Sequence, residues 1–417
     1  MIYKKILSFF VFLFLIGCFL FSNICFAVSN APDISAEAAI LIDSSSGDVF
    51  YKKNEEQRMF PASTTKILTA ILTLENSSLD DVVTVPYDAI STIPSGYSIA
   101  ALQTGEQLTV NQLLQMMMVH SANDAANVLA FHISGSIEGF ADLMNQKALE
   151  LGMNNTHFTN PSGMQDENHY TTAYDLALLM KYCMENNTFR HLAGLKSCDI
   201  PATNKYQART FTTTNDLLVN SQSNIANNSY YEYAIAGKTG FTSEARNCLV
   251  SAASKDGLEL ICVVLAAGVN SNGSSTKFSD SKKLFEFGYE NYGIKTFIEQ
   301  GYTVSNITIP NATDETKSLD LVVSSTVSAL METSKMSDKI EPQIELNSNL
   351  FAPISQGEIV GKVVYTVDGK EYSADLIASH NVIPSNSFVA IGGIVLLVFV
   401  LLILFKLLFP KKKVNKI

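Results

Sequence analysis

Strand-like sequence lies at both ends of the first 290 residues of this chain, and helix-like sequence lies between them. Residues Ala38 to Lys53 predict two strands joined by a Ser-Gly-Asp turn. Further strands are predicted at Tyr233–Gly237, Cys248–Ala253 and Leu258–Ala267, the last two joined by a turn at Asp256-Gly257. Strands that come first and last can share one antiparallel sheet that carries the helices on its faces. We therefore predict an α+β fold for this part.

The intervening region shows helical patterns broken by short loops. Thr109 and Gln112 have the spacing of a capping box, which begins an apolar helix through Met118. Two further helices are predicted at Gly139–Leu151 and Thr172–Met184.

Beyond Asn291 the pattern changes to short alternating strands. Val363–Val367 and Tyr372–Ile377 flank Asp368-Gly369, which predicts a hairpin. Between the two apolar ends of the chain, a body of about 360 residues is too long for a single hydrophobic core. We therefore expect a boundary near Asn291 and a small all-β module after it.

The N-terminus has the layout of a secretory signal peptide. Lys4 and Lys5 precede an apolar stretch from Ile6 to Phe21, and Cys25 and Ala27 are small residues that an export peptidase accepts. We predict a signal peptide over residues 1–27, with cleavage after Ala27.

The C-terminus carries the second apolar segment, Phe388 to Phe405, which has 18 residues and no charge. A helix of this length crosses the hydrocarbon layer of a membrane. Lys406 and a cluster at Lys411–Lys413 follow, and positive charge stays on the cytoplasmic side. We predict a transmembrane anchor over residues 388–409 and a cytoplasmic basic tail over residues 410–417. Everything before the anchor then lies outside the cell.

The charge balance of the body argues against nucleic acid as a partner. Seven of the 29 basic residues lie in the two end segments, which hold no acidic residue. The remaining 22 basic and 40 acidic residues give the body a net charge of −18. A surface of this sign repels a polyanion.

Four cysteines lie outside the signal segment: Cys183, Cys198, Cys248 and Cys262. Their spacing fits no metal site, and the six histidines are scattered, so we expect no metal or other cofactor. The predicted turn would pair Cys248 with Leu265 and Ser251 with Cys262 across the last two strands. We therefore expect buried free thiols instead of a disulfide between these two cysteines.

Ser63 and Lys66 lie three residues apart at the start of the apolar run Pro61–Leu72. On a helix this spacing places the ammonium within reach of the hydroxyl. If both are buried, the lysine loses its proton more easily and can act as a base. The pair alone indicates little, because the same spacing recurs at Ser274 with Lys277.

Two other short motifs carry polar residues where the surrounding sequence is apolar. Ser121, Ala122 and Asn123 interrupt a helical stretch. Lys238-Thr239-Gly240 ends an apolar strand, and the missing Cβ of Gly240 could let a substrate backbone approach closely. The three motifs begin 58 and then 117 residues apart, in the order known for penicillin-binding proteins and class A β-lactamases.

On these motifs the chain resembles the low-molecular-mass penicillin-binding proteins of the D-alanyl-D-alanine carboxypeptidase type, peptidase family S11. The similarity covers nearly the whole chain. Its landmarks are AAILIDSSSGDVFYKKNEEQRMFPASTTKILTA, LGMNNTHFTNPSGMQDENHYTTAYDLALLMKY, GKTGFTSEARNCLV and PISQGEIVGKVVYTVDGKEY. The resemblance implies a penicillin-binding/β-lactamase-like domain over residues 28–290, a β-rich domain over residues 291–384, and a membrane anchor.

The resemblance also implies catalytic roles. Ser63 would attack the carbonyl between two terminal D-alanines of a peptidoglycan stem peptide, and β-lactam antibiotics would acylate the same residue. Lys66 would accept the hydroxyl proton. Ser121 would relay a proton to the leaving amine, and Asn123 would hydrogen bond either to Lys66 or to the substrate. The backbone N–H groups of Ser63 and Phe241 would form the oxyanion hole.

The implied binding side of the site lies on the last motif. Lys238 would lower the pKa of Lys66 and attract the substrate carboxylate. Thr239 and Thr242 are candidates to bind that carboxylate. Some relatives carry an arginine where this chain has Thr214, so Arg246 is a third candidate, unless it forms an ion pair with Glu244 on the surface.

Three other features of the sequence bear on the assignment of catalytic roles. Ala122 replaces the common glycine of the second motif, which is acceptable if its φ is negative. Glu150 with Asn154 matches the spacing of a β-lactamase deacylating base, but we attribute this to accident. We interpret NPSGMQDENHY, with Asp166 and His169, as a structural loop beside the site.

Two rival functions remain at this stage. One is a serine β-lactamase, against which the second domain and the anchor argue. The other is a non-catalytic cell-wall scaffold protein, against which the complete set of motifs argues. We expect a D-Ala-D-Ala carboxypeptidase in the cell membrane, with a single span and its catalytic domain facing the wall.

Overall fold

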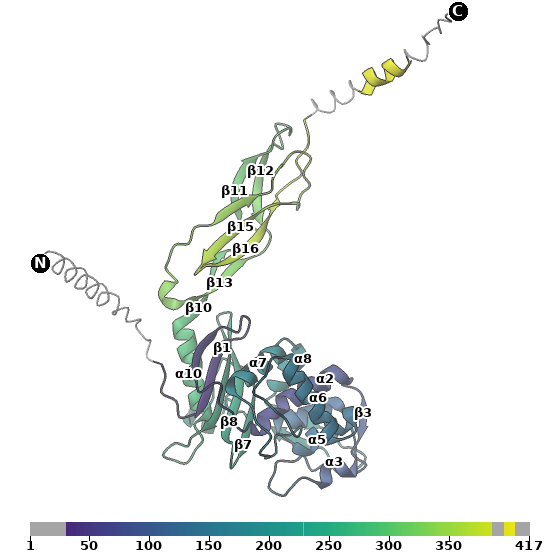
Figure 1. Ribbon diagram of the computed structural model, residues 1–417, viewed down its shortest axis with the longest axis vertical. Coiled ribbons are helices and arrows are strands. Elements are labelled where there is room, and N and C mark those ends of the chain that lie inside the picture. The colour runs from purple at the N-terminus through teal and green to yellow at the C-terminus, as the bar shows by residue number, and fades with distance from the viewer. Residues whose placement is uncertain (1–30, 228, 386–395, 405–417) are drawn as a thin grey trace, which may run out of the picture. The chain divides into compact units, whose positions relative to one another are not determined.

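The computed structural model describes residues 31–227, 229–385 and 396–404. It divides into two compact units, one ending at Asn291 and the other beginning at Tyr292, which we call unit 1 and unit 2 (Figure 1). The predicted signal peptide lies outside the described residues, as does most of the predicted anchor, of which residues 396–404 form a helix. Among the helices that the structure describes, none is both long and apolar enough to cross a membrane.

Unit 1 is built on one five-stranded antiparallel sheet with the order β2-β1-β9-β8-β7. Its strands are β1 (Ala38–Asp43), β2 (Val49–Lys53), β7 (Ala234–Thr242), β8 (Arg246–Lys255) and β9 (Leu258–Ala267). The first and last strands of unit 1 do share a sheet, as predicted. β7 runs further than expected, so that the whole Lys-Thr-Gly motif lies within it.

The register between β8 and β9 confirms half of the predicted pairing. Ser251 faces Cys262 as expected. Cys248 does not face Leu265, because the register shifts between Asn247 and Leu249. The four cysteines outside the predicted signal segment are buried and free, so the expectation of free thiols is confirmed.

Helices cover both faces of this sheet. The helices described in unit 1 are α2 (Lys66–Asn76), α3 (Tyr87–Ser91), α4 (Val110–Val119), α5 (Asn123–Ser134), α6 (Ile137–Glu150), α7 (Ala173–Met184), α8 (Asn187–Ala193), α9 (Gln222–Ala226) and α10 (Lys277–Asn291), of which α9 has no buried residue. The predicted capping box at Thr109 and Gln112 is present in full, and the two other predicted helices lie within two residues of their expected bounds.

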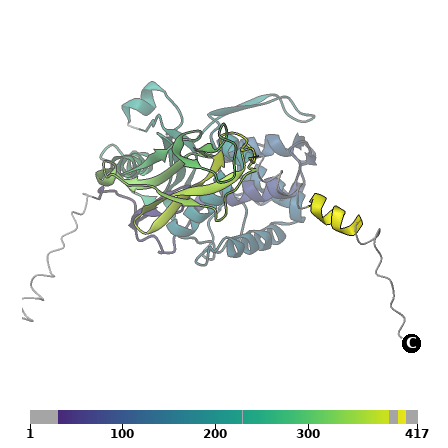
Figure 2. The same ribbon diagram turned by 90° about the horizontal axis from the view of Figure 1, so that it is seen from above.

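The alternation along β1 shows how the two faces are filled. Ile40 and Ile42 belong to the core shared with α2, α4, α5, α6 and α7. Leu41 points to the other face, where α10 packs so closely that a Cβ on Gly288 would lie 2.9 Å from the Leu41 side chain. Figures 1 and 2 show the early helices, drawn purple to blue, as one group beside the sheet.

Two small hairpins complete the helical part of unit 1. β3 (Val82–Thr84) pairs with β4 (Gln107–Thr109), and β5 (Ser197–Ile200) pairs with β6 (Arg209–Thr212).

Up to residue 385, unit 2 is built of β-strands with one short 3₁₀ helix (Thr333–Lys335), and it confirms the predicted all-β module. A five-stranded antiparallel sheet has the order β11-β12-β16-β15-β14, and a second sheet pairs β10 with β13. The strands are β10 (Tyr292–Ile298), β11 (Thr303–Thr308), β12 (Ser318–Val323), β13 (Val327–Glu332), β14 (Gln343–Leu346), β15 (Ile359–Val367) and β16 (Lys370–Ala378). The predicted hairpin turns at Asp368 and Gly369, whose φ angles of 47° and 81° match a type I′ turn.

A buried ion pair ties the two hairpins of unit 1 together. Glu106, fully buried beside β4, pairs with Arg209 of β6 and accepts a hydrogen bond from Thr203 at 2.9 Å. Burying two charges is costly, but removing one partner is costlier, because the other charge is left unpaired.

We expect Arg209→Met to lower the free energy of unfolding by about 3–5 kcal/mol, because Glu106 would stay buried without its partner. The double variant Glu106→Gln with Arg209→Met should recover most of the loss. Denaturant unfolding curves of the three proteins measure both effects, and an unchanged midpoint in the single variant would contradict this account.

Candidate active site

Ser63 lies in a strained turn that precedes α2. The short 3₁₀ helix η1 (Ala62–Thr65) presents it, and Ala62 adopts a φ of 48°, in the left-handed region that costs a residue with a Cβ about 1 kcal/mol. This turn packs against β7 at Gly240, where a Cβ would lie 2.9 Å from the Pro61 carbonyl oxygen and 3.1 Å from the Ser63 nitrogen. A Cβ at position 240 would press on the serine turn, so this glycine also has a structural role, and the room that it leaves for a substrate stays a prediction.

Lys66 begins α2 and is completely buried. Its Nζ lies 2.9 Å from Ser63 Oγ, 2.7 Å from Asn123 Oδ1 and 2.5 Å from the carbonyl oxygen of Ser162. Three separate segments of the chain therefore converge on one amine.

The chemistry of these three contacts restricts where the protons can be. The Asn123 and Ser162 oxygens can only accept hydrogen bonds, whereas a hydroxyl can donate or accept. A neutral Lys66 has two N–H donors, which the two oxygens take up. Its lone pair then faces the Ser63 hydroxyl, which must be the donor. In the neutral state the contact is thus a serine O–H that points at a base.

The surroundings favour this neutral state. Burial, with the nearby Lys238 as the second cause, lowers the pKa of Lys66 well below its usual range, and only Asp124 acts in the opposite direction. Lys238 is itself buried in β7, where its Nζ donates to the Thr239 carbonyl oxygen at 3.0 Å. Burial and the charge of Lys277 lower the pKa of Lys238 to about 7.

The second motif is held by a loop on the other side of the cleft. Asn123 is the first residue of α5, and its side-chain amide donates to the Ser98 carbonyl oxygen at 2.9 Å. Ser121 has a φ of 63°, and Ala122 has a φ of −60°, so the condition for tolerating alanine in this motif is met.

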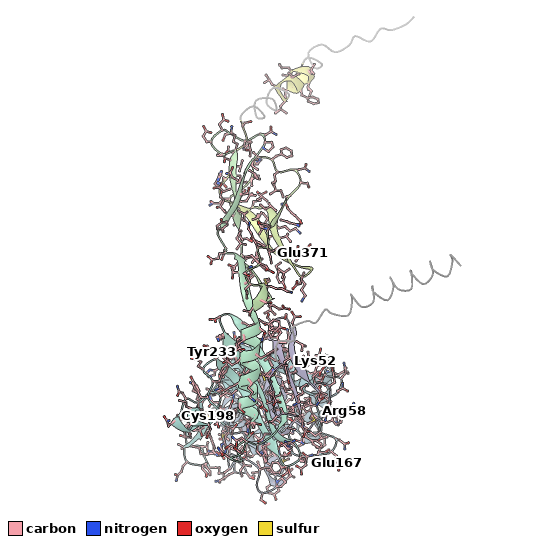
Figure 3. All side chains as sticks on the ribbon, turned by 90° about the vertical axis from the view of Figure 1, so that its left-hand side faces the viewer. Lys52, Arg58, Glu167, Cys198, Tyr233 and Glu371 are labelled. Atoms are coloured by element: carbon pink, nitrogen blue, oxygen red, sulfur yellow. The ribbon has the colours of Figure 1, made fainter. Side chains whose placement is uncertain are left out.

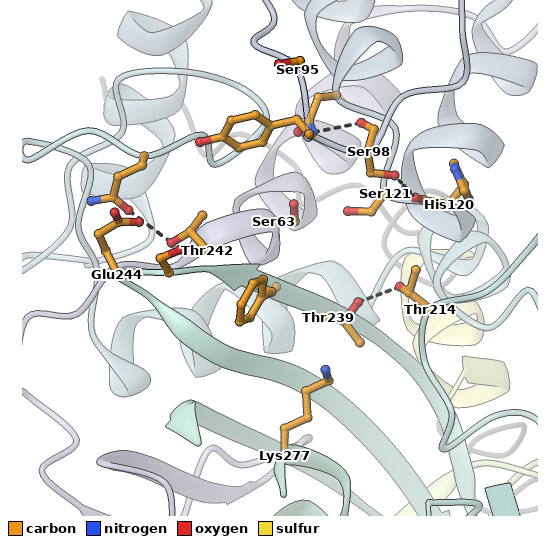
Figure 4. Close-up of a pocket in the computed structure, with 17 residues that line it drawn as sticks. Ser63, Ser95, Ser98, His120, Ser121, Thr214, Thr239, Thr242, Glu244 and Lys277 are labelled. Atoms are coloured by element: carbon orange, nitrogen blue, oxygen red, sulfur yellow. Dashed lines mark hydrogen bonds between the residues drawn. The ribbon is translucent and has the colours of Figure 1, made fainter. Parts of the chain in front are cut away.

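These elements surround a cavity of about 630 Å³ (Figure 4). Seven of the nine predicted site residues line it: Ser63, Ser121, Asn123, Thr239, Gly240, Phe241 and Thr242. The other two, Lys66 and Lys238, lie buried behind the walls, where Lys66 contacts Ser63 and Lys238 adjoins Thr239. Phe241 is the most exposed residue of the Lys-Thr-Gly strand, with 64% of its surface accessible.

One end of the cavity holds a group of donors, Thr214, Thr239 and Lys277, of which the sequence motifs marked only Thr239 as a binding residue. Thr214 Oγ1 and Thr239 Oγ1 lie 2.6 Å apart, so the hydroxyl of Thr214 is part of the site. Lys277, the first residue of α10, lines the same end, and its amine points toward Thr239 in Figure 4. We had noted Lys277 only because of its spacing from Ser274, and no motif around it marks it as a site residue.

Thr242 and Arg246 are engaged differently from each other. The hydroxyl of Thr242 faces the cavity, accepts from the Ala245 backbone N–H at 2.9 Å and donates to Gln165 at 3.2 Å. The guanidinium of Arg246 forms an ion pair with Glu37, not with Glu244, and Arg246 does not line the cavity. Its candidacy for carboxylate binding is therefore not supported.

The loop that we interpreted as structural supplies one of the three oxygen partners of the Lys66 amine. The Ser162 carbonyl that contacts Lys66 is held in place because Asn160 Oδ1 accepts the backbone N–H groups of Gly163 at 2.8 Å and Met164 at 3.0 Å. Gly163 has a φ of 79°, and a Cβ on it would collide with the Ala62 carbonyl oxygen. The loop is thus wedged against the serine turn.

The acidic residues and the histidine of this region do not line the cavity. His169 Nδ1 accepts from the Thr159 backbone N–H at 3.1 Å, so its Nε2–H donates to Thr65 Oγ1 at 2.8 Å. Burial lowers the pKa of His169 to about 3, so it is neutral and structural. Asp166 is exposed and accepts the Asn168 backbone N–H at 2.7 Å, and its neighbour Glu167 is exposed on the surface of unit 1 (Figure 3). Glu150 pairs with Lys147 outside the cavity.

No group of three or more His, Cys, Asp or Glu side chains suited to a metal ion occurs within residues 31–227, 229–385 and 396–404.

Comparisons with known proteins identify the family of the chain. A family model described as D-alanyl-D-alanine carboxypeptidase matches residues 26–268, and one described as the C-terminal domain of penicillin-binding protein 5 matches residues 292–383. The D-alanyl-D-alanine carboxypeptidase DacF of Bacillus subtilis is 30% identical over 358 residues, which cover 85% of this chain and 87% of that protein.

Solved structures show the same relationship. The carboxypeptidase DacD from Francisella tularensis matches with a TM-score of 0.59 and 29% identity, covering 85% of this chain and 95% of that one. Penicillin binding protein 5 from Haemophilus influenzae matches with a TM-score of 0.59 and 28% identity, covering 84% and 98%. Because this family model matches more than half of the chain, the chain belongs to the D-alanyl-D-alanine carboxypeptidases, peptidase family S11.

Proposed function

We propose that this protein is a serine-type D-Ala-D-Ala carboxypeptidase that removes the terminal D-alanine from peptidoglycan stem pentapeptides and is acylated by β-lactams. The observation that carries the proposal is the contact between the Ser63 hydroxyl and the buried Lys66 amine, whose other two partners can only accept hydrogen bonds. This arrangement makes the serine nucleophilic without a histidine.

Acylation begins with attack of Ser63 Oγ on the carbonyl carbon between the two D-alanines. The hydroxyl proton moves to the Lys66 lone pair, and the resulting ammonium is stabilised by the Asn123 and Ser162 oxygens already in place. Ser121 passes a proton to the leaving amine. The backbone N–H groups of Ser63 and Phe241 stabilise the oxyanion, where losing one donor costs roughly 3–4 kcal/mol. Water then hydrolyses the ester.

The free carboxylate of the last D-alanine binds at the end of the cavity where Thr239, Thr214 and Lys277 meet. The two hydroxyls are hydrogen bonded to each other and can both turn toward an anion. Lys277 adds the positive charge that an arginine would supply. Thr242 lies further along β7 and has its hydroxyl engaged, so we assign it to the peptide portion of the substrate.

We further propose the domain plan predicted from the sequence. It comprises a signal peptide over residues 1–27, a catalytic domain over 28–290, a β-rich domain over 291–384, a transmembrane anchor over 388–409 and a basic tail over 410–417. The support is the 18-residue uncharged segment with the lysines that follow it. The catalytic domain then faces the cell wall from a single-pass membrane anchor.

The two rival functions are not favoured. Glu150, the only match to a β-lactamase deacylating base that we noted in the sequence, lies outside the cavity and pairs with Lys147. A non-catalytic scaffold would have no need for a buried lysine against the serine.

Ser63→Ala should reduce release of D-alanine from diacetyl-Lys-D-Ala-D-Ala by at least about 1,000-fold, because no other group can form the acyl-enzyme. It should also abolish labelling by fluorescent penicillin, with the label on the native protein mapping to Ser63 by mass spectrometry. Ser274→Ala is the matched control, since Ser274 has the same spacing from a lysine, and it should remain active. Absence of D-alanine release from the native protein would refute the proposed activity.

Gly163→Ala should slow acylation by penicillin at least about 10-fold, since a displacement near 1 Å in a catalytic group can cost more than that. The reason is that the new Cβ pushes the loop, and with it the Ser162 carbonyl, away from Lys66. Gly152→Ala is the control, because Gly152 has a similar φ of 77° but no atom within 4 Å of the new Cβ. Equal acylation rates in the two variants would contradict a role for the loop position.

Lys238→Met should move the ascending limb of the acylation pH profile to higher pH, because the variant lacks the ammonium that lowers the pKa of Lys66. Lys238 is charged below its own pKa of about 7, so the difference from the native protein should be largest below pH 7 and fade above it.

Lys277→Met provides the comparison for this profile. The limb should not move to higher pH, because Lys277 acts on Lys238 and not directly on Lys66. Instead KM should rise for peptides with a free C-terminal carboxylate. A shift to higher pH in the Lys277 variant, or none in the Lys238 variant, would argue against the assigned roles.

A further inference from the structure

Unit 2 holds the chain firmly at the point where it leaves toward the proposed anchor. The Ser385 backbone N–H donates to the Asn311 carbonyl oxygen at 2.8 Å, and Pro384 pairs with Ala312 as an isolated bridge. Ser385 precedes Phe388, the first residue of the uncharged apolar segment, by three residues. Three residues span at most about 10 Å even when fully extended.

This short distance places one end of unit 2 at the membrane. The polar headgroup layer on each side of the hydrocarbon is about 5–7 Å thick. If Phe388 enters the hydrocarbon, Ser385 lies in that layer or directly above it. The groups that surround Ser385 must then lie at the bilayer surface as well.

Two large apolar side chains are exposed at this same end. Ile383 and Phe351 have 54% and 50% of their surfaces accessible. They lie on neighbouring segments, because Ile354 and Val382 form an antiparallel bridge. The Ala352 N–H also donates to the Pro310 carbonyl oxygen at 3.5 Å, so the Phe351 loop borders the same Pro310–Ala312 segment as the exit.

The charges at this end do not offer electrostatic attraction to a membrane. Lys317, a nearby cation, pairs with Asp314 at 2.7 Å, and Glu315 is exposed beside them. Glu358 accepts the Ser355 backbone N–H at 2.9 Å. Contact with lipid would therefore depend on the apolar side chains, which suit the boundary between headgroups and acyl chains.

We propose that Phe351 and Ile383 form a bilayer-contact surface that inserts into the headgroup region next to the anchor. This inference rests on the anchor proposed above. The partner of these two residues is lipid, and their contact with it holds the end of unit 2 against the membrane. Unit 2 then does not swing freely on the three-residue connection.

The chain contains no tryptophan, so a single introduced tryptophan reports one position. We would compare Phe351→Trp with Tyr302→Trp in the full-length protein, reconstituted into phosphatidylcholine vesicles that contain lipid spin-labelled at a shallow acyl position. Tyr302 is a matched control, because it is 61% exposed but lies at the far end of β11, six residues or about 20 Å from the exit end. Ile383→Trp provides a second test position.

We expect tryptophan at 351 and at 383 to be quenched by the spin-labelled lipid at least twofold and to emit at shorter wavelength than in detergent without the label. Tryptophan at 302 should show neither change. If the chain floats with the vesicles but the tryptophans at 351 and 383 behave like that at 302, the contact surface is refuted while the anchor stands. If the chain does not float with vesicles, anchor and contact surface both fail, whereas D-alanine release still tests the carboxypeptidase activity separately.

Discussion

The site depends on one buried amine. Lys66 has no access to water and three oxygen partners, of which only the Ser63 hydroxyl can donate a proton. Burial of a lysine normally destabilises a fold, because the charged form loses its hydration. Here the cost falls on the charged form only. The neutral form is fully hydrogen bonded, and it is the form that can activate a nucleophile.

Keeping three chain segments around that amine requires unusually close backbone contacts. The serine turn is pressed from one side by β7 at Gly240 and from the other by the loop at Gly163, and neither position has room for a Cβ. Ala62 and Ser121 adopt left-handed φ angles, which are uncommon for residues other than glycine. Such strain persists because the packed sheet and helices around it fix the backbone. The rigid core of unit 1 thus supports the geometry of the site.

The sequence predicted those parts of the site whose chemistry belongs to a side chain in a recognisable motif. Ser63, Lys66, Asn123 and the Lys238 strand converge as expected. The Ser162 contribution could not be foreseen, because a backbone carbonyl has no residue signature. Lys277 was missed for a different reason. Only the packing of α10 against the sheet brings Lys277 to the cavity. The register shift at Cys248 was missed as well, because the alternation of apolar and polar residues along a strand does not show where a bulge occurs.

The three lysines form a series that explains why the neutral state of Lys66 does not depend on burial alone. Lys277 lowers the pKa of Lys238, and Lys238 lowers that of Lys66. The first and last lysines each have an acid that raises their pKa, Asp216 for Lys277 and Asp124 for Lys66. Asp124 is itself occupied by the backbone N–H groups of Ala100 and Leu102. A substrate carboxylate at Lys277 would offset its positive charge and so let Lys238 keep its proton to higher pH. Binding of the correct substrate would therefore strengthen the field that keeps Lys66 a free base.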